Sequence, residues 1–282
     1  MTLATLADVL GPALSGGYAV AGLVVLGWED ARAYVDAAES EGLPVILQAG
    51  PGCRRHTPLE VLAAMFKTLG NSAGVPVVAH LDHATSIKEC RHAIDCGFTS
   101  VMFDGSHFPL EQNIELTAEA AQVAHSAGVS CEGEIGIVGH SGGKTSSSTV
   151  PDEAEQFARS TGIDAMAISV GNLHLQRAPS ATIELDRIRA VESVVNIPLV
   201  LHGGSGIDTK MRQRLAAETA VCKFNIGTEL RMVFGKALRS AMKKDPNRFD
   251  RVEILKETEE PVRETTRSII RSIGPQRLSQ PN

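Results

Sequence analysis

The sequence of 282 residues has few aromatic residues, no excess of basic residues and no long hydrophobic run. One tryptophan, two tyrosines and eight phenylalanines are too few for the aromatic platform on which single-stranded nucleic acids stack. The formal net charge of −6 gives no electrostatic reason to expect nucleic acid or an anionic membrane as a partner. No uncharged apolar stretch reaches the roughly 18 residues that a membrane-spanning helix requires, so no membrane partner is predicted.

Closely spaced cysteine pairs are also missing. The five cysteines are odd in number and scattered, a usage typical of reduced thiols that pack as small apolar groups. The first twenty residues lack a basic segment ahead of a long apolar run, so no secretory signal is predicted. We therefore expect a cytoplasmic protein and assign the cysteines no catalysis.

Short apolar runs recur along the chain, with amphipathic segments between them, as expected for repeated βα units. Several runs are apolar at successive positions, which is typical of parallel strands covered on both faces. The eight predicted strands are Tyr18–Leu26, Pro44–Ala49, Pro76–Asp82, Ser100–Asp104, Val129–Ile135, Ala165–Val170, Pro198–His202 and Val221–Ile226.

The segments between the strands have helical periodicity. The predicted helices are Trp28–Glu41, Thr57–Leu69, Ser86–Cys96, Leu110–Ser126, Asp152–Ser160, Ile183–Val194, Thr209–Ala217 and Glu229–Lys243. Many end at a glycine, which can stop a helix in a left-handed conformation: Gly42, Gly70, Gly97, Gly128 and Gly162. A further amphipathic stretch, Arg251–Ile273, is one helix more than a barrel needs. It is either a C-terminal helix or an oligomer contact, and its sequence does not decide between the two.

Length alone permits one large α/β barrel or two ordinary domains, but eight βα units without a linker-like break favour the barrel. We predict a (β/α)8 TIM barrel, as a single domain over residues 1–282 with an extra C-terminal helix. The stretch Gly139–Thr149 is rich in Gly, Ser and Thr and predicts a mobile loop after the fifth strand. It is either a solvated connection or a lid that orders over substrate.

Polar residues close several predicted strands, where the side chains of a parallel barrel point into its mouth. They are His80, Asp82, His83, Asp104, His107, Glu132, Glu134, Asn172, His174, His202, Lys223 and Asn225. A single histidine is more often part of a hydrogen-bonded structure than a ligand. Three histidines and a carboxylate at equivalent strand ends, however, form a ligand set that suits zinc or another divalent metal.

The segment His202-Gly203-Gly204-Ser205-Gly206 follows an apolar strand and precedes a helix. It is either a tight turn or a phosphate site built from amides and a hydroxyl at a helix N-terminus. Barrels often bind phosphate near their seventh and eighth strands, and Asn225 lies at the end of the eighth.

Four segments in order carry a family resemblance: AHLDHATSIKECRHAIDCGFTSVMFDGSHFPLEQNIELT, CEGEIG, LVLHGGSGID and CKFNIGTELR. With them, residues 18–275 resemble the metal-dependent class II fructose- and tagatose-bisphosphate aldolases. The resemblance implies a barrel enzyme that cleaves or forms a carbon–carbon bond next to a ketone. It also implies a divalent metal, most often Zn²⁺, a monovalent cation in many members, and a homodimer or homotetramer.

The resemblance also assigns roles to residues. His83, His174 and His202 match the metal ligands, and Glu134 matches a carboxylate that approaches the metal. Asp82 matches the catalytic acid/base that exchanges a proton with the hydroxyl formed or consumed in the aldol step. Substrate- or phosphate-binding positions are matched by Gly203, Ser205 and Asn225.

This chain departs from the family at several site positions. The usual asparagine-rich turn after the first strand is replaced by Leu23–Gly27, which predicts the loss of amides that touch Asp82. The acidic pair after the fifth strand is missing from residues 139–143, His174 is followed by Leu175, and the position two beyond Asn225 is Gly227. These changes predict altered handling of the donor half of the substrate.

We therefore predict a metal-dependent aldolase that acts, through a metal-stabilised enolate or enediolate, on a small phosphorylated or otherwise anionic hydroxy-ketone. His140 is a candidate to replace the missing carboxylate, and a donor that forms its enolate by decarboxylation would not need one. Two alternatives are a non-catalytic sugar-phosphate-binding descendant and a metal-dependent hydrolase or isomerase on the same barrel.

Overall fold

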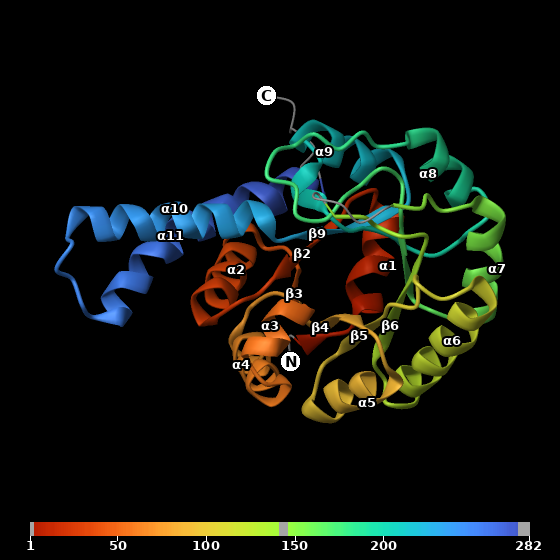
Figure 1. Cartoon of the computed structure of the whole chain (residues 1–282), viewed down its shortest axis with the longest axis horizontal. Coiled ribbons are helices and arrows are strands. Elements are labelled where there is room, and N and C mark those ends of the chain that lie inside the picture. Colours follow the sequence, from red (N-terminus) through yellow and green to blue (C-terminus); the bar gives the residue numbers. More distant parts are fainter. Residues whose placement is uncertain (1–2, 141–145, 276–282) are drawn as a thin grey trace.

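The computed structural model describes residues 3–140 and 146–275, and its central feature is a closed barrel of eight parallel strands (Figure 1). Neighbouring strands pair in chain order, and the last pairs with the first to close the barrel. The strands are β2 (Val20–Val24), β3 (Val45–Ala49), β4 (Val77–Ala84), β5 (Ser100–Phe103), β6 (Ser130–Ile135), β7 (Ala165–Ile168), β8 (Leu199–Leu201) and β9 (Val221–Ile226). Each lies within its predicted range or within two residues of it, so the predicted TIM barrel is confirmed.

Helices surround the barrel and bury their apolar faces against the outside of the strands. They are α2 (Trp28–Glu41), α4 (Leu59–Ser72), α5 (Ile87–Cys96), α6 (Leu110–Ser126), α7 (Pro151–Thr161), α8 (Leu185–Glu192), α9 (Thr209–Glu218) and α10 (Thr228–Lys244). None of the described helices is both long and apolar enough to cross a lipid bilayer.

The predicted glycine stops hold at Gly42, Gly97, Gly128 and Gly162, all of which have positive φ angles. The stop predicted at Gly70 is wrong, because α4 continues to Ser72. A Cβ on Gly70 would lie 2.6 Å from the Leu3 side chain. The glycine therefore makes room for the N-terminal segment.

The sequence patterns missed three short elements: β1 (Leu3–Ala4), α1 (Leu6–Gly16) and α3 (Pro51–His56). β1 pairs with the beginning of β4, and α1 starts at a capping box. The apolar face of α1 packs against the barrel interior at the beginnings of the strands, including Val20 and Val78. α1 therefore closes the end of the barrel opposite the strand C-termini.

The C-terminal helix α11 (Arg251–Ile273) is present as predicted and pairs with α10 in a hairpin that projects from the barrel (Figure 1). The end of α11 near the barrel packs on α2, where Arg267 and Arg271 both bind the Glu41 carboxylate. At the far end of the hairpin, Phe249 is 94% exposed and Val252 is 71% exposed.

Candidate active site

The C-terminal ends of the strands surround a cavity of about 690 Å³. Its lining includes seven of the eight site residues predicted from the sequence: Asp82, His83, Glu134, His174, Gly203, Ser205 and Asn225. His202, the eighth, directly follows β8 and is fully buried beside them. The fold thus brings together residues from five separate segments of the chain.

The three histidines converge on one point. The ring centroid of His83 lies 4.6 Å from that of His202 and 5.3 Å from that of His174, and one ligand atom from each of the three residues lies within 4.8 Å of the others. Nδ1 of His202 and Oε2 of Glu134 are 3.4 Å apart, and both are buried without a hydrogen-bond partner among the described residues. Buried polar atoms are almost always satisfied. A cation between these atoms would satisfy both, so the residues present fit a divalent metal with nitrogen and oxygen ligands.

Two carboxylates fix the orientation of the histidine rings. Nδ1 of His83 is 2.7 Å from Oδ2 of Asp104, and Nε2 of His202 is 3.1 Å from Oε1 of Glu132. If the histidines donate these hydrogen bonds, Nε2 of His83 and Nδ1 of His202 keep free lone pairs. Such partners are typical of metal-binding histidines. Sequence reasoning noted Asp104 and Glu132 at strand ends but gave them no role, because their partners lie on other strands.

Glu132 is part of a fully buried ionic network. Its Oε2 lies 2.5 Å from Nζ of Lys223, which is also 3.3 Å from Nε2 of His80. Burial opposes ionisation of Glu132, but Lys223 and His202 outweigh it and lower its pKa. Burial and the Lys223 charge lower the pKa of His80 to about 3, so His80 is neutral near pH 7. Lys223 thus keeps Glu132 ionised and able to accept from His202.

Burial and neighbouring charges shift the pKa values of the cavity residues in different directions. Burial alone would lower the pKa of His83, but Asp82, Asp104 and Glu134 raise it to about 10. Burial raises the pKa of Glu134 well above its usual range, and the negative charge of Asp104 adds to this. In His174, burial and the neighbouring histidines lower the pKa to about 2. His83 and Glu134 therefore hold their protons more strongly than usual, and a metal ion bound there would have to displace these protons.

Asp82 is 5% exposed, and two side-chain amides hold it. Its Oδ1 accepts hydrogen bonds of 3.2 Å from Nε2 of Gln48 and from Nδ2 of Asn225. Burial raises the pKa of Asp82, but His83, His202 and Lys223 outweigh burial and lower it, so the carboxyl group is ionised. Residues 23–27 provide no side-chain amide, and Gln48 of β3 supplies one to Asp82 instead. Its signal in the sequence is a single polar residue inside the apolar run of β3.

The glycine-rich turn after β8 depends on close backbone contact. Gly203 has a φ of 66°, and a Cβ there would lie 2.2 Å from the carbonyl oxygen of Leu173. Ser205 Oγ accepts from the backbone N–H groups of Gly227 and Glu229, at 3.3 and 3.1 Å. The hydroxyl therefore joins the turn to the N-terminus of α10 and keeps its own hydrogen free to donate.

The structure shows how the chain accommodates two of its departures from the family pattern, at Leu175 and at His140. Leu175 has a φ of 61°, so it keeps the left-handed backbone that a glycine would adopt without strain. His140 lines the cavity, with its ring centroid 5.0 Å from that of His174. The predicted loop Gly139–Thr149 falls partly on residues 141–145, outside the described residues, so its role as a lid stays a prediction.

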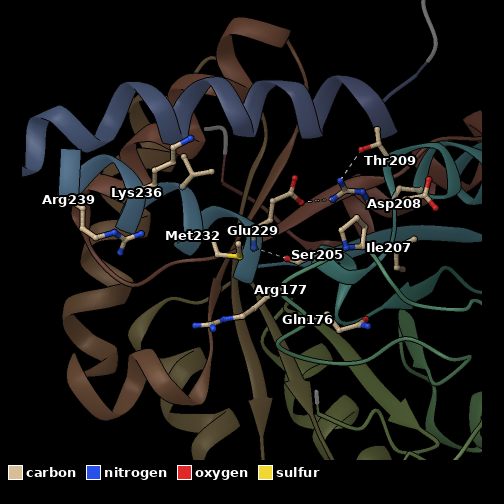
Figure 2. Close-up of a pocket in the computed structure, with 13 residues that line it drawn as sticks. Gln176, Arg177, Ser205, Ile207, Asp208, Thr209, Glu229, Met232, Lys236 and Arg239 are labelled. Carbon is tan, nitrogen blue, oxygen red and sulfur yellow. Dashed lines mark hydrogen bonds and ion pairs between the residues drawn. The ribbon is translucent and has the colours of Figure 1, made fainter. Parts of the chain in front are cut away.

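A second cavity of about 780 Å³ shares Ser205 with the first (Figure 2). Arg177, Lys236 and Arg239 line it, together with an ion pair between Arg212 and Glu229 at 3.0 Å. None of the three converging histidines lines this cavity. The chemistry therefore belongs to the smaller cavity at the centre of the barrel mouth.

Comparison with known proteins agrees with this arrangement. A family model described as class-II fructose-bisphosphate aldolase matches residues 4–276. A fructose-bisphosphate aldolase of Geobacillus stearothermophilus is 36% identical over 281 residues, covering 97% of this chain and 98% of that protein. One of Staphylococcus epidermidis is 33% identical over 283 residues with the same coverage. The crystal structure of the YdjI aldolase from Escherichia coli K12 is 30% identical with a TM-score of 0.82, covering 99% of this chain and 100% of that one.

Proposed function

The chain belongs to the class II fructose-bisphosphate aldolase family and is a metal-dependent aldolase, and we propose that its reaction takes place on a small phosphorylated or otherwise anionic hydroxy-ketone at the mouth of the barrel. One observation carries the proposal: three histidines and Glu134 converge beside an ionised Asp82 in one cavity. The family supports carbon–carbon chemistry over the binding-protein and hydrolase alternatives.

In this proposal His83, His174 and His202 hold the metal, and Glu134 approaches it. The nitrogen-rich ligand set supports Zn²⁺ as the metal. A divalent metal bound there polarises the substrate ketone and stabilises negative charge on its oxygen.

Asp82 is the proposed acid/base. In the cleavage direction its carboxylate takes the proton from the substrate hydroxyl whose carbon becomes the aldehyde, and in the synthetic direction it returns that proton. The amides of Gln48 and Asn225 support this role because they hold Oδ1 in place. Oδ2, the other oxygen of the carboxylate, is then the atom proposed to take up and return the proton.

Gly203, Ser205 and Asn225 form the proposed phosphate site. The turn at Gly203 and the N-terminus of α10 meet at Ser205, and both line the cavity. Backbone N–H groups at a helix N-terminus favour an anion. A monovalent cation beside the phosphate is part of the proposal, on the strength of the family alone.

The donor half of the substrate is proposed to differ from that of the usual sugar bisphosphates. The described residues of the loop after β6 hold no carboxylate between 139 and 147, whereas His140 lines the cavity. Either His140 moves the proton at the donor carbon, or the donor is a keto acid that forms its enolate by losing CO₂.

The test is a metal analysis combined with a screen of donors and aldehydes that includes dihydroxyacetone phosphate and keto acids. We expect stoichiometric metal and aldol turnover. Turnover with a keto acid but not with dihydroxyacetone phosphate would select the decarboxylating donor. A fully metallated protein that turns over no donor and aldehyde pair contradicts the proposed activity and supports the binding-protein alternative. Substrate cleavage by water without release of an aldehyde would support the hydrolase alternative.

We also propose that the chain is one domain, forms a homodimer or homotetramer, and works in the cytoplasm. Phe249 and Val252 are exposed apolar side chains in an otherwise charged segment at the far end of the α10–α11 hairpin, and we propose that they contact a second copy. The five cysteines, all free, support a reducing compartment.

A further inference from the structure

Asp82 and His83 are consecutive residues, yet both side chains line the same cavity. In a regular β-strand, neighbouring side chains point to opposite faces. His83 escapes this alternation with a φ of 54°, in the left-handed region that residues with a Cβ rarely adopt. The pairing of β4 with β5 also shifts register between Leu81 and Ala84. The irregular backbone of this segment therefore places both side chains in the site. Contacts from neighbouring residues are needed to stabilise that backbone conformation.

The Arg54 side chain lies against this irregular segment. Arg54 belongs to α3, and its side chain is 8% exposed. Nη1 donates to the carbonyl oxygens of Ala49 and Asp82, both at 2.5 Å, and Nη2 donates to the carbonyl oxygen of His83 at 3.1 Å. One guanidinium group thus joins the end of β3 to the two residues that leave the regular geometry of β4.

Glu89 orients the Arg54 guanidinium from the far side. Its Oε1 accepts from Nε of Arg54 at 2.8 Å, and its Oε2 accepts from the backbone N–H of Thr85 at 3.4 Å. Glu89 stands in the first turn of α5, whose N-cap is Ser86. The carboxylate and three carbonyl oxygens match the planar fork of an arginine, whereas a lysine ammonium cannot present its donors in that geometry.

We propose that Arg54 is a positioning residue, which holds the Asp82–His83 backbone so that the proton-transfer carboxylate and a metal-ligating imidazole enter the site together. The inference rests on the proposed function for the roles of these two residues. Arg54 itself does not line the cavity, and it acts through the carbonyl groups of Asp82 and His83.

The test compares Arg54→Met and Arg54→Lys with Arg267→Met, a matched control in which an arginine that binds a glutamate is removed from α11. Co²⁺ alone is the first probe, because its visible absorption reports the arrangement of its ligands. We expect both Arg54 variants to bind Co²⁺ about tenfold more weakly or worse and with a changed spectrum. With metal at saturation, kcat should fall about 100-fold and KM should change little, since misplacement of reacting groups acts on the chemical step. Arg267→Met should keep the wild-type spectrum and kcat.

A further variant, Arg54→Ala, distinguishes a loss of positioning from a loss of folding. In a folded variant, added guanidinium at low millimolar concentration can occupy the position of the missing side chain. It should then restore part of the kcat and of the Co²⁺ spectrum. The inference is overturned if folded Arg54→Met and Arg54→Lys bind Co²⁺ with wild-type affinity and spectrum. It is also overturned if added guanidinium restores neither signal. If the wild-type protein binds Co²⁺ but shows no aldol turnover, the proposed function fails, and the Co²⁺ comparison still decides the role of Arg54.

Discussion

At the scale of single residues, the site works because neighbouring groups set one another's charge. Lys223 keeps Glu132 ionised, Glu132 orients His202, and His202 with His83 helps to keep Asp82 ionised despite its burial. Each carboxylate thus has a separate task that follows from its partners. Removing one member should change a defined property of the site rather than the whole fold.

Replacing Asp82 by asparagine tests the proposed acid/base. Asparagine keeps the shape of the side chain but cannot take up a proton, so kcat should fall by about 10²- to 10⁴-fold while metal stays bound. Steady-state kinetics with metal analysis of the same sample measures both. Asp152→Asn, an exposed carboxylate on α7, is the control. Near-normal cleavage by Asp82→Asn would remove Asp82 from the mechanism.

Metal binding should release protons. Without metal, His83 is protonated near pH 7 because its pKa is about 10, and Glu134 also retains its proton more strongly than usual. Metal ligands must be deprotonated, so metal affinity should increase as the pH rises from 6 toward 10. Calorimetry in two buffers of different ionisation enthalpy should find at least about one proton released per Zn²⁺ at pH 7.

Two histidine variants test whether the proton release comes from metal binding at the proposed site. His202→Ala should lose both the stoichiometric metal and the proton release, whereas His125→Ala, outside the site on α6, should keep both. Unchanged metal content in His202→Ala would remove His202 from the ligand set. Binding without proton release by the wild-type protein would contradict the charge state derived for His83.

At the scale of elements, function depends on how strands end. The polar site residues lie near or just beyond the C-terminal ends of the strands, where the local backbone sets the direction of their side chains. Left-handed φ angles occur at His83 inside the end of β4 and, in the turns after β7 and β8, at Leu175 and Gly203. A change in these turns should therefore disturb the site more than the same change in a distant turn.

Gly203→Ala tests this at the turn after β8. The new Cβ would meet the carbonyl oxygen of Leu173, so the turn must shift away from the proposed phosphate position. We expect KM for a phosphorylated donor to rise at least about tenfold, since remote phosphate contacts contribute to substrate binding. Gly42→Ala is the control, because Gly42 has a φ of 67° but no atom within 4 Å of the new Cβ. It should cost only roughly 1–2 kcal/mol of stability. Equal KM values for both variants would argue against a phosphate at this turn.

At the scale of the whole molecule, the chain has a closed barrel and a projecting hairpin with different surfaces (Figure 1). α1 seals one end of the barrel, and the site occupies the other. The hairpin of α10 and α11 carries exposed apolar side chains at its far end. The proposed contact with a second copy is placed at this end of the hairpin.

Phe249→Asp should weaken the proposed oligomer. Phe249 is 94% exposed, so a charge there should cost little folding stability but should oppose burial in an interface. Sedimentation analysis should find a dimer or tetramer for the wild-type chain and a shift toward monomer for the variant. Val61→Asp, an exposed apolar position on α4, should leave the mass unchanged. A monomeric wild-type chain would show the predicted oligomer to be wrong.

Local sequence patterns predicted the fold and many of the residues at the barrel mouth. The eight apolar runs, the amphipathic segments between them and the glycines at helix ends predicted the barrel, because hydrophobic periodicity and backbone freedom are local properties. Strand-end polarity predicted which residues lie at the mouth, and Asp82, His83, Glu134, His174 and Asn225 do line the same cavity.

What local patterns could not reveal were pairings between distant residues. The partners of Asp82 are Gln48 and Asn225, those of His202 include Glu132, and Arg54 binds carbonyl groups about 30 residues away. Nothing in the periodicity of a strand identifies such a partner, since it depends on which strands become neighbours when the barrel closes. The sequence by itself thus determines which residue types are available for the chemistry. Their charge states and orientations depend on the closed barrel, which packs residues from distant segments against one another.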